Sequence, residues 1–273
     1  MFQKATSNSS FGSAFSIWAV IYHTTVRSVR MGHSSAIVAL LMNILQSCML
    51  VAAFYMMFSL LGLKGAKLRG DFILYIMSGI FMYMTHVKAV SAVMSAEGAT
   101  SKMMQHAPMN TAISIISAAL SALYTQTLSL LVILFAYHTL LNPVYIADPV
   151  SALGLFVLSW ATGCAVGLVL FALSPWFPTF TSLFATLYRR VQMLASGKMF
   201  VANTLPPVVL AMFDWNPLFH IIDQVRGYMF NNYFPRNSDL EYPIYVGIAL
   251  VMIGLMGEFY TRQHVSSSWS ARR

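Results

Sequence analysis

Long stretches without a charged side chain constrain the fold of this chain most. No Lys, Arg, Asp or Glu occurs in residues 32–63, 72–87, 103–147 or 149–188. A helix that crosses a bilayer needs roughly 20 mostly apolar residues. Only 9% of the residues are charged, whereas a soluble domain carries about 25%. These observations exclude a water-soluble globule, a disordered chain and a nucleic-acid-binding domain.

The uncharged stretches predict an all-α membrane protein with six transmembrane helices. Two of the uncharged stretches need a comment. Lys88 can extend its amine to the interface from the end of a span, and the prolines in Ser174–Pro178 divide the stretch 149–188 in two. The fifth span is the weakest, because Arg189 and Arg190 lie near its start and Lys198 lies inside it. The predicted spans are 37–63, 72–87 and beyond, 111–141, 150–173, 183–205 and 242–259.

The basic residues predict the orientation, because cytoplasmic loops carry the excess of Lys and Arg. With six spans both termini lie on one side, and that side holds ten basic and two acidic residues against six and six on the other. Both termini are therefore predicted to be cytoplasmic. The positive excess then lies beside the membrane, so the net charge of +8 needs no nucleic acid to explain it. No signal peptide is expected.

Residues 14–30 predict an amphipathic cytoplasmic helix before the first span. Phe15, Trp18, Tyr22, Val26 and Val29 recur at spacings of three and four, and Arg27 and Arg30 share another face. Such a helix is expected in the headgroup plane, with its arginines near anionic lipid. It serves either as a docking collar for a partner or lipid substrate or as a plain interfacial anchor.

Two connections differ from simple turns. Loop 94–108 is polar and rich in helix formers, which suits either a short surface helix that receives force from a partner or a connector. Residues 205–233 contain two proline breaks around a short apolar run, which predicts a re-entrant hairpin between spans five and six. Its second helix places His220, Asp223 and Arg226 on one face, and Asp223 is expected to pair with Arg226. This group is either a polar gate or a satisfied ion pair.

Aromatic side chains concentrate in the first two spans. Phe54 and Phe58 lie one turn apart, and Phe72, Tyr75 and Tyr83 fall near one helical face. They could stack on sugars passing through a pore, or they could be packing and interfacial residues.

Several catalytic motifs are absent from the sequence. It has no phosphate-binding loop, no His-Glu-x-x-His helix and no Gly-x-Ser-x-Gly elbow. The two cysteines, Cys48 and Cys164, are too few for a disulfide framework or a zinc site. No Asp, Glu, Lys or Arg lies at the centre of a span, which argues against an ion-coupled transporter. We therefore expect no metal or cofactor on this chain and no ATPase activity of its own.

One group of residues resembles a known family. Arg189, Ser196-Gly197, Leu205-Pro206 and the helix that begins Trp215-Asn216-Pro217-Leu218 and continues with His220 and Arg226 look like the permease subunits of ABC-type polysaccharide exporters, which export capsular polysaccharide, O-antigen and related lipid-linked glycans. Asp223 stands where that family has Glu. The N-terminal helix carries Tyr22-His23 where family members often carry Arg-Glu.

The resemblance implies a homodimer in the bacterial inner membrane, driven by two copies of a separate subunit that binds ATP and Mg²⁺. It implies a cytoplasmic tail with an interface helix (1–36), a transmembrane domain (37–260) and a basic tail (261–273). It further implies that the lipid-linked glycan and membrane lipids contact the chain, with periplasmic or outer-membrane export proteins as further possible partners. The implied site residues are Ser95, Glu97, Gly98, Ser101 and Lys102 for ATPase coupling; Arg27, Arg30, Arg189 and Arg190 for headgroup capture; Phe54, Phe58, Phe72, Tyr75 and Tyr83 for the channel; and Trp215, Asn216, Pro217, His220, Asp223 and Arg226 for an outer gate.

Two alternatives stay open at this point. The same architecture could export another amphiphile, such as a drug or a teichoic-acid-like polymer. A membrane-embedded glycosyl or acyl transferase is the alternative from another class. It would need a carboxylate or His cluster facing one leaflet, and the only such cluster is His220, Asp223 and Arg226.

Overall fold

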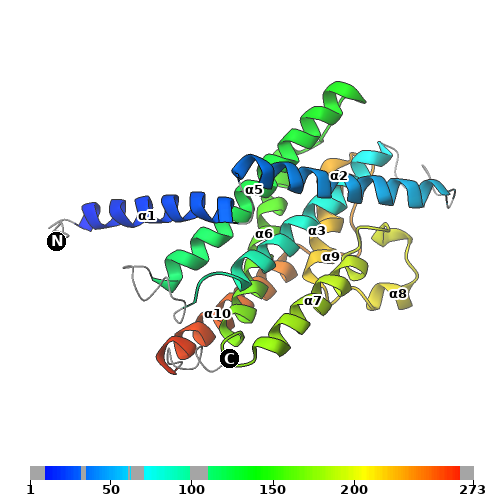
Figure 1. The fold of residues 1–273 in the computed structure, drawn as a ribbon. Coiled ribbons are helices and arrows are strands. Elements are labelled where there is room, and N and C mark those ends of the chain that lie inside the picture. Colours follow the sequence, from blue (N-terminus) through cyan, green and yellow to red (C-terminus); the bar gives the residue numbers. More distant parts are fainter. Residues whose placement is uncertain (1–9, 32–34, 61, 63–70, 99–109, 265–273) are drawn as a thin grey trace.

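The computed structural model describes residues 10–31, 35–60, 62, 71–98 and 110–264, and over these residues the chain is helical without strands. Figure 1 shows the helices gathered into one bundle, with α1 projecting from one side and α8 at the opposite edge. The elements are α1 (Ser10–Met31), α2 (Ala36–Leu60), α3 (Phe72–Met94), α5 (Thr111–Leu140), α6 (Pro149–Leu173), α7 (Pro178–Ala195), the 3₁₀ turn η1 (Ala202–Thr204), α8 (Pro207–Ala211), α9 (Pro217–Met229) and α10 (Glu241–His264).

Five of these helices are long and apolar enough to cross a membrane: α2, α3, α5, α6 and α10. They coincide with five of the predicted spans to within a few residues, except that α3 continues to Met94, as the uncharged run beyond Lys88 allows. The chain therefore has the build of a multi-pass membrane protein.

The fifth predicted span, 183–205, differs from the observed helix. Helix α7 begins at Pro178, which occupies the first helical turn, and ends at Ala195. Ser196 caps it, and Gly197 then takes a positive φ of 76°, a conformation that L side chains other than glycine rarely adopt. Helix α7 is also amphipathic, with Thr181, Ala185 and Gln192 buried on one face. It is therefore not among the five apolar helices.

Acidic and amide side chains begin several of the helices. Asp71 accepts from the Ile73 N–H at the start of α3, and Asn110 caps α5 through the Ala112 N–H. Asp148 accepts from the N–H groups of Val150 and Ser151 at the start of α6, where Pro149 fills the first position. Such caps satisfy backbone donors that the first helical turn leaves free.

Helices α3, α6 and α10 form the tightest part of the bundle. A Cβ placed on Gly163 of α6 would lie 2.5 Å from the His86 carbonyl oxygen of α3, and one on Gly167 would lie 2.8 Å from the Val90 carbonyl oxygen. On the other side of α6, Gly254 of α10 faces Leu168 and Gly257 faces Ala172. Small residues allow membrane helices to approach this closely.

The same contacts give the helix directions. In the contacts between α3 and α6, residue numbers increase together along the two helices, and the same holds for α6 and α10. The three helices therefore run in one direction. Helix α2 runs the opposite way, because Gln46 meets Lys88 and Phe58 meets Phe72. Since α6 and α10 are parallel, the chain between them must return across the bundle. We call the end where α3 finishes and α5 begins the α3–α5 end, and the other the α5–α6 end.

Helix α1 confirms the helix predicted over residues 14–30. It contacts α5, where the Ser117 hydroxyl donates to the Ile21 carbonyl over 3.3 Å and the Ile21 side chain is buried. Trp18 and Tyr22 on its predicted apolar stripe stay 66% and 65% exposed. An apolar surface therefore remains uncovered on α1.

Candidate functional site

Two of the residues that carry the family resemblance, Asn216 and Arg226, contact the end of α7 or the turn that follows it. Asn216 is buried at the start of α9, where its side-chain oxygen accepts from the Leu218 N–H. Its amide also exchanges two hydrogen bonds with the Gln192 amide of α7, at 3.1 and 2.7 Å, and donates to the Ala195 carbonyl. Asn216 thus joins the last turn of α7 to the first turn of α9.

Arg226, near the C-terminal end of α9, connects this helix to the turn that follows α7. Its guanidinium donates to the carbonyl oxygens of Gly197, Lys198 and Phe200, at 3.1, 2.9 and 2.7 Å. It lies over the Tyr75 ring with its Cζ 4.2 Å from the ring centroid. A helix end leaves carbonyl groups unsatisfied, and a cation nearby also suits the helix dipole. Arg226 therefore stabilises the turn that follows α7.

The predicted pairing of Asp223 with Arg226 is wrong. Both side chains are buried, but Asp223 accepts hydrogen bonds from the hydroxyl groups of Tyr233 and Ser238 instead. Burial, together with the neighbouring Asp223 carboxylate, raises the pKa of the Tyr233 hydroxyl above its ordinary range, which keeps it a donor. The spacing of three residues puts Asp223 and Arg226 on one face of a helix. Asp223 nevertheless bonds the loop after α9, and Arg226 bonds the turn after α7.

Lys198 is a second buried cation at the end of α7. Its amine donates to the Met193 carbonyl at 2.6 Å and lies over the ring of Tyr83, 3.6 Å from the centroid, and near that of Phe54, at 5.5 Å. A Cβ on Gly79 of α3 would clash with the Lys198 backbone. Sequence reasoning counted Lys198 only as a charge that weakened a span, whereas it lies against two of the predicted channel aromatics.

The five predicted channel aromatics are brought together on α2 and α3. Phe54, Tyr75 and Tyr83 are buried, and Phe72 contacts Phe58 and Tyr75 with ring centroids 5.6 and 6.1 Å apart. In the single chain these rings pack within the core and against Lys198 and Arg226. A role in lining a channel concerns an assembly of two chains and stays a prediction.

A chain of buried hydrogen bonds, which sequence reasoning missed, connects this region to α3 and α6. The His86 Nδ1 lies 3.2 Å from both the Ser159 carbonyl and the Thr162 hydroxyl, and the His86 Nε2 lies 2.8 Å from the Tyr188 hydroxyl. The Tyr188 hydroxyl in turn accepts from the Gln192 amide at 2.9 Å. A consistent assignment protonates Nδ1 and leaves Nε2 to accept from Tyr188.

His220 fixes the loop between α9 and α10. Its Nδ1 accepts from the Asp239 N–H at 2.9 Å, so the ring proton lies on Nε2, which is 2.7 Å from the Asp214 carbonyl. The Asp214 carboxylate, 3.4 Å from Nε2, therefore faces a neutral ring. Trp215 is exposed, and its carbonyl accepts from the Tyr242 hydroxyl. Of the predicted gate residues, Trp215 alone presents its side chain to the outside of the bundle.

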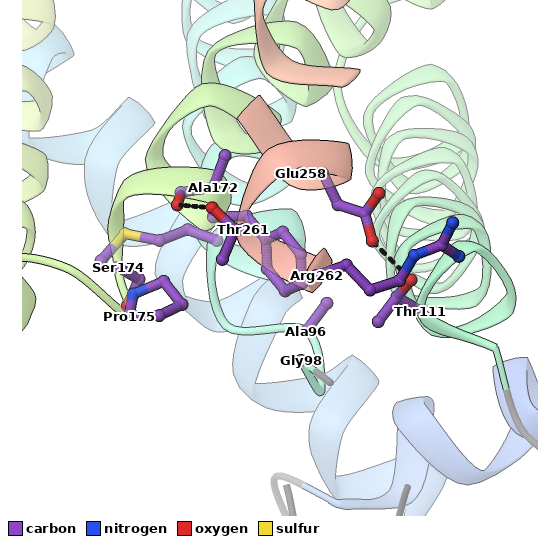
Figure 2. A pocket seen from close by; sticks show the side chains of 11 residues that line it. Ala96, Gly98, Thr111, Ala172, Ser174, Pro175, Glu258, Thr261 and Arg262 are labelled. Atoms are coloured by element: carbon purple, nitrogen blue, oxygen red, sulfur yellow. Dashed lines mark hydrogen bonds between the residues drawn. The ribbon is translucent and has the colours of Figure 1, made fainter. Parts of the chain in front are cut away.

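The predicted coupling loop begins at a small pocket at the α3–α5 end. Ser95 caps α3, and the Glu97 N–H donates to the Ser114 hydroxyl at 2.9 Å. Gly98 lines a pocket of about 190 Å³ between the ends of α3, α6 and α10 and the start of α5. Figure 2 shows Glu258 of α10 pointing toward Thr111, whose hydroxyl donates to it at 2.6 Å. Ser101 and Lys102 lie outside the described residues.

The four arginines predicted to capture a headgroup are not brought into one cluster. Arg189 donates to the hydroxyl groups of Ser91 and Thr186 and is partly buried between α7 and α3. Arg190 and Arg27 are exposed on α7 and α1. Arg30 lies near the end of α1, and its side chain is outside the described part of the chain. Among the described residues, no group of three His, Cys, Asp or Glu side chains could hold a metal ion.

No protein-family profile matches this chain, and a search of curated proteins finds no match either. The resemblance to the polysaccharide exporters therefore rests on the residues around α7 and α9 and on the order of the helices.

Proposed function

We propose that this chain is the membrane permease subunit of an ATP-driven ABC exporter that moves lipid-linked polysaccharide, of the capsule or O-antigen type, across the bacterial inner membrane. In this proposal two copies form a homodimer, and two separate ATP-binding subunits contact the cytoplasmic ends of the helices. Six passes place both termini in the cytoplasm, and residues 205–233 form the re-entrant outer gate.

One observation carries the proposal. Two polar residues of the motif, Asn216 and Arg226, are buried, and both hydrogen bond to the end of α7 or to the turn that follows it. Asn216 bonds Gln192 and Ala195, and Arg226 bonds the turn 197–200. Both side chains therefore hold α9 against the end of α7, which gives these two motif residues a common structural role.

The helix directions support six passes. Helices α6 and α10 run parallel, so α7 and the elements after it must carry the chain back. Helix α7 reaches α3 near its middle, where the Tyr83 hydroxyl meets the Arg189 carbonyl and His86 meets Tyr188. Helix α9 covers the remaining distance to the α5–α6 end, where the Tyr228 carbonyl accepts from the Asp148 N–H. Two short helices joined by Asn216 thus replace one long one.

The outer surface of α7 supports assembly. Phe180, Leu183, Leu187 and Leu194 follow one face of this helix and are each more than half exposed. In a dimer, this stripe is available to a second copy of the chain, and in a monomer it would face lipid.

The test begins with the chain tagged and purified from native membranes in mild detergent. We expect a stoichiometric subunit with a phosphate-binding loop, identified by mass spectrometry, and ATP-dependent movement of a lipid-linked glycan after reconstitution. A chain that purifies without an ATPase in several detergents, and that transfers glycosyl or acyl groups alone, would overturn the proposal in favour of a transferase. Transport of another amphiphile and not of the glycan would correct the substrate.

Replacement of residues 97–102 by a Gly/Ser segment of equal length tests the coupling role. We expect the dimer and the ATPase subunits to remain assembled while ATP-driven export is lost. A matched replacement in the loop 142–147 at the α5–α6 end serves as control. Wild-type export by the 97–102 variant would remove the coupling assignment.

A further inference from the structure

A second, larger pocket lies near the α3–α5 end, on the side of α3 where α2 and α5 pack. It encloses about 660 Å³ between the last residues of α1, the first half of α2, the last third of α3 and the first half of α5. None of the motif residues of α7 and α9 lines it. Its walls differ in chemistry, which allows its ligand to be inferred.

The wall formed by α2 and α5 contains buried amides. The Asn43 amide donates to the Ser129 hydroxyl at 2.8 Å, and the Gln126 amide donates to the Asn43 side-chain oxygen at 3.0 Å. Gln126 is 2% exposed, and its Oε1 has no hydrogen-bond partner. A buried acceptor without a donor is energetically unfavourable. Since Gln126 lines the pocket, a ligand that donates an O–H or N–H would satisfy it.

The wall formed by α3 is positively charged. The Lys88 ammonium donates to the Gln46 side-chain oxygen at 2.8 Å, and an ammonium has two further N–H groups to donate. Ser91, one turn further along α3, also lines the pocket and holds the Arg189 guanidinium at 3.1 Å. Among the described residues that line the pocket, none carries a carboxylate. This wall therefore suits an anionic group.

The remaining wall is apolar and continuous with the membrane surface. Met42, Leu45 and Met49 of α2 line the pocket and are also about half exposed on the outside of the helix. Because α2 is an apolar helix of spanning length, these side chains would face lipid. An alkyl chain could therefore lie along α2 while its polar end occupies the pocket.

We propose that this pocket binds the phosphate-linked, hydroxyl-bearing headgroup of a membrane amphiphile. The phosphate lies at Lys88, a headgroup hydroxyl donates to the Gln126 Oε1, and the alkyl chain follows Met42, Leu45 and Met49. The proposal deepens the proposed function, because a lipid-linked glycan has this chemistry. The assignment to a lipid-linked glycan rests on the proposed function, whereas an anionic phospholipid with a polyol headgroup has the same chemistry and requires only a membrane location.

The test measures lipid binding to the full-length chain by native mass spectrometry in mild detergent. Phosphatidylglycerol carries both a net negative charge and hydroxyl donors, and phosphatidylcholine carries neither a net charge nor an O–H or N–H donor in its headgroup. We expect phosphatidylglycerol to bind about tenfold more tightly, since a hydroxyl donated to the Gln126 Oε1 and a net negative charge beside Lys88 are together enough for that difference. Equal binding of the two lipids would overturn the proposal.

Two variants test whether the lipid binds in this pocket. Lys88→Met removes the charge and Ala92→Leu fills the pocket without changing charge, and each is expected to abolish the preference for phosphatidylglycerol. Arg236→Met removes an exposed charge in the loop before α10, at the α5–α6 end of the bundle. It is the matched control. Size-exclusion profiles and melting temperatures show which variants fold. If both pocket variants fold and keep the preference, the proposal fails.

A competition experiment separates the two sources of the ligand. A prenyl phosphate that carries one hexose is titrated against bound phosphatidylglycerol. Displacement at lower concentration than phosphatidylglycerol itself assigns the pocket to a lipid-linked sugar, and displacement only at higher concentration assigns it to bulk anionic lipid. No step involves ATP, so the outcome is independent of whether an ATPase subunit is found.

Discussion

Two regions of this bundle hold together by opposite means. Helices α3, α6 and α10 approach through glycines, so that backbone lies against backbone at Gly163 and Gly167. The segment from α7 to α9 is built from short helices, and side-chain amides, hydroxyls and two cations join them. Unbroken helices satisfy their own backbone, whereas broken ones leave groups that need partners at membrane depth. The difference shows where this chain uses polar residues within an apolar bundle.

The largest expected effect comes from removing Arg226. Arg226→Met leaves three carbonyl groups of the turn 197–200 without their donor, and each unsatisfied buried group costs roughly 1–3 kcal/mol. We expect the free energy of unfolding, measured by titrating mixed micelles with a denaturing detergent, to fall by about 3 kcal/mol or more. Arg236→Met, at an exposed position, is expected to leave it unchanged. Equal stability of the two variants would contradict the role of Arg226.

The glycine contacts allow a smaller test of the other region. Gly163→Ala would place a methyl group 2.5 Å from the His86 carbonyl oxygen, and overpacking of this kind costs roughly 1–3 kcal/mol. Gly154→Ala lies in the same helix with no atom within 4 Å of its added Cβ, so it is expected to leave stability unchanged or slightly higher. If both substitutions behave alike in the same unfolding assay, close backbone contact is not what holds α3 to α6.

A double-mutant cycle on Gln192 and Asn216 isolates the amide pair. Neighbouring residues in one hydrogen-bond network show coupling energies of about 0.5–3 kcal/mol. We expect the coupling between Gln192→Ala and Asn216→Ala to fall in this range. Gln192→Ala combined with Gln46→Ala, which belongs to a different hydrogen bond, should be additive. Additivity of the first pair would mean that the amides contribute separately.

The smallest expected effect comes from removing the charge of Asp148, which caps the start of α6. The Ser151 hydroxyl, and then the N–H groups of Ser151 and Val150, hold the pKa of this carboxyl below its usual value. The charged cap therefore stabilises the fold above the unfolded pKa of about 3.9, and this stability is lost as the pH falls through the folded value. Asn can also cap a helix, so Asp148→Asn isolates the charge. Its melting temperature should lie below that of the wild type at pH 7, and the gap should close below about pH 4. A gap that does not change with pH would contradict this.

Charge and hydropathy were enough to predict the five apolar helices, because a spanning helix depends mainly on its own residues. They were not enough for α7. Its end depends on Gly197, and its buried face on partners such as His86, about a hundred residues earlier. The pairing of Asp223 with Arg226 failed for the same reason, since local spacing says nothing of the carbonyls that the turn 197–200 presents. The pocket beside Lys88 was also missed, because Lys88 was interpreted as a charge reaching for the interface. Lys88 and the amides Asn43, Gln46 and Gln126, all in otherwise apolar runs, were the signal in the sequence.

The arrangement of Arg226, Asn216 and Gln192 also has a mechanical consequence. A displacement of α9 relative to α7 would have to break the guanidinium bonds to the turn and the amide pair together. Helices α7 and α9 are therefore expected to move together as one rigid body. The loop 230–240 is tied to the same body through His220, Asp223 and Gln224, whereas the turn 174–177 precedes it. A force applied near the start of α7 would be delivered, with little loss, to the loop that carries Trp215.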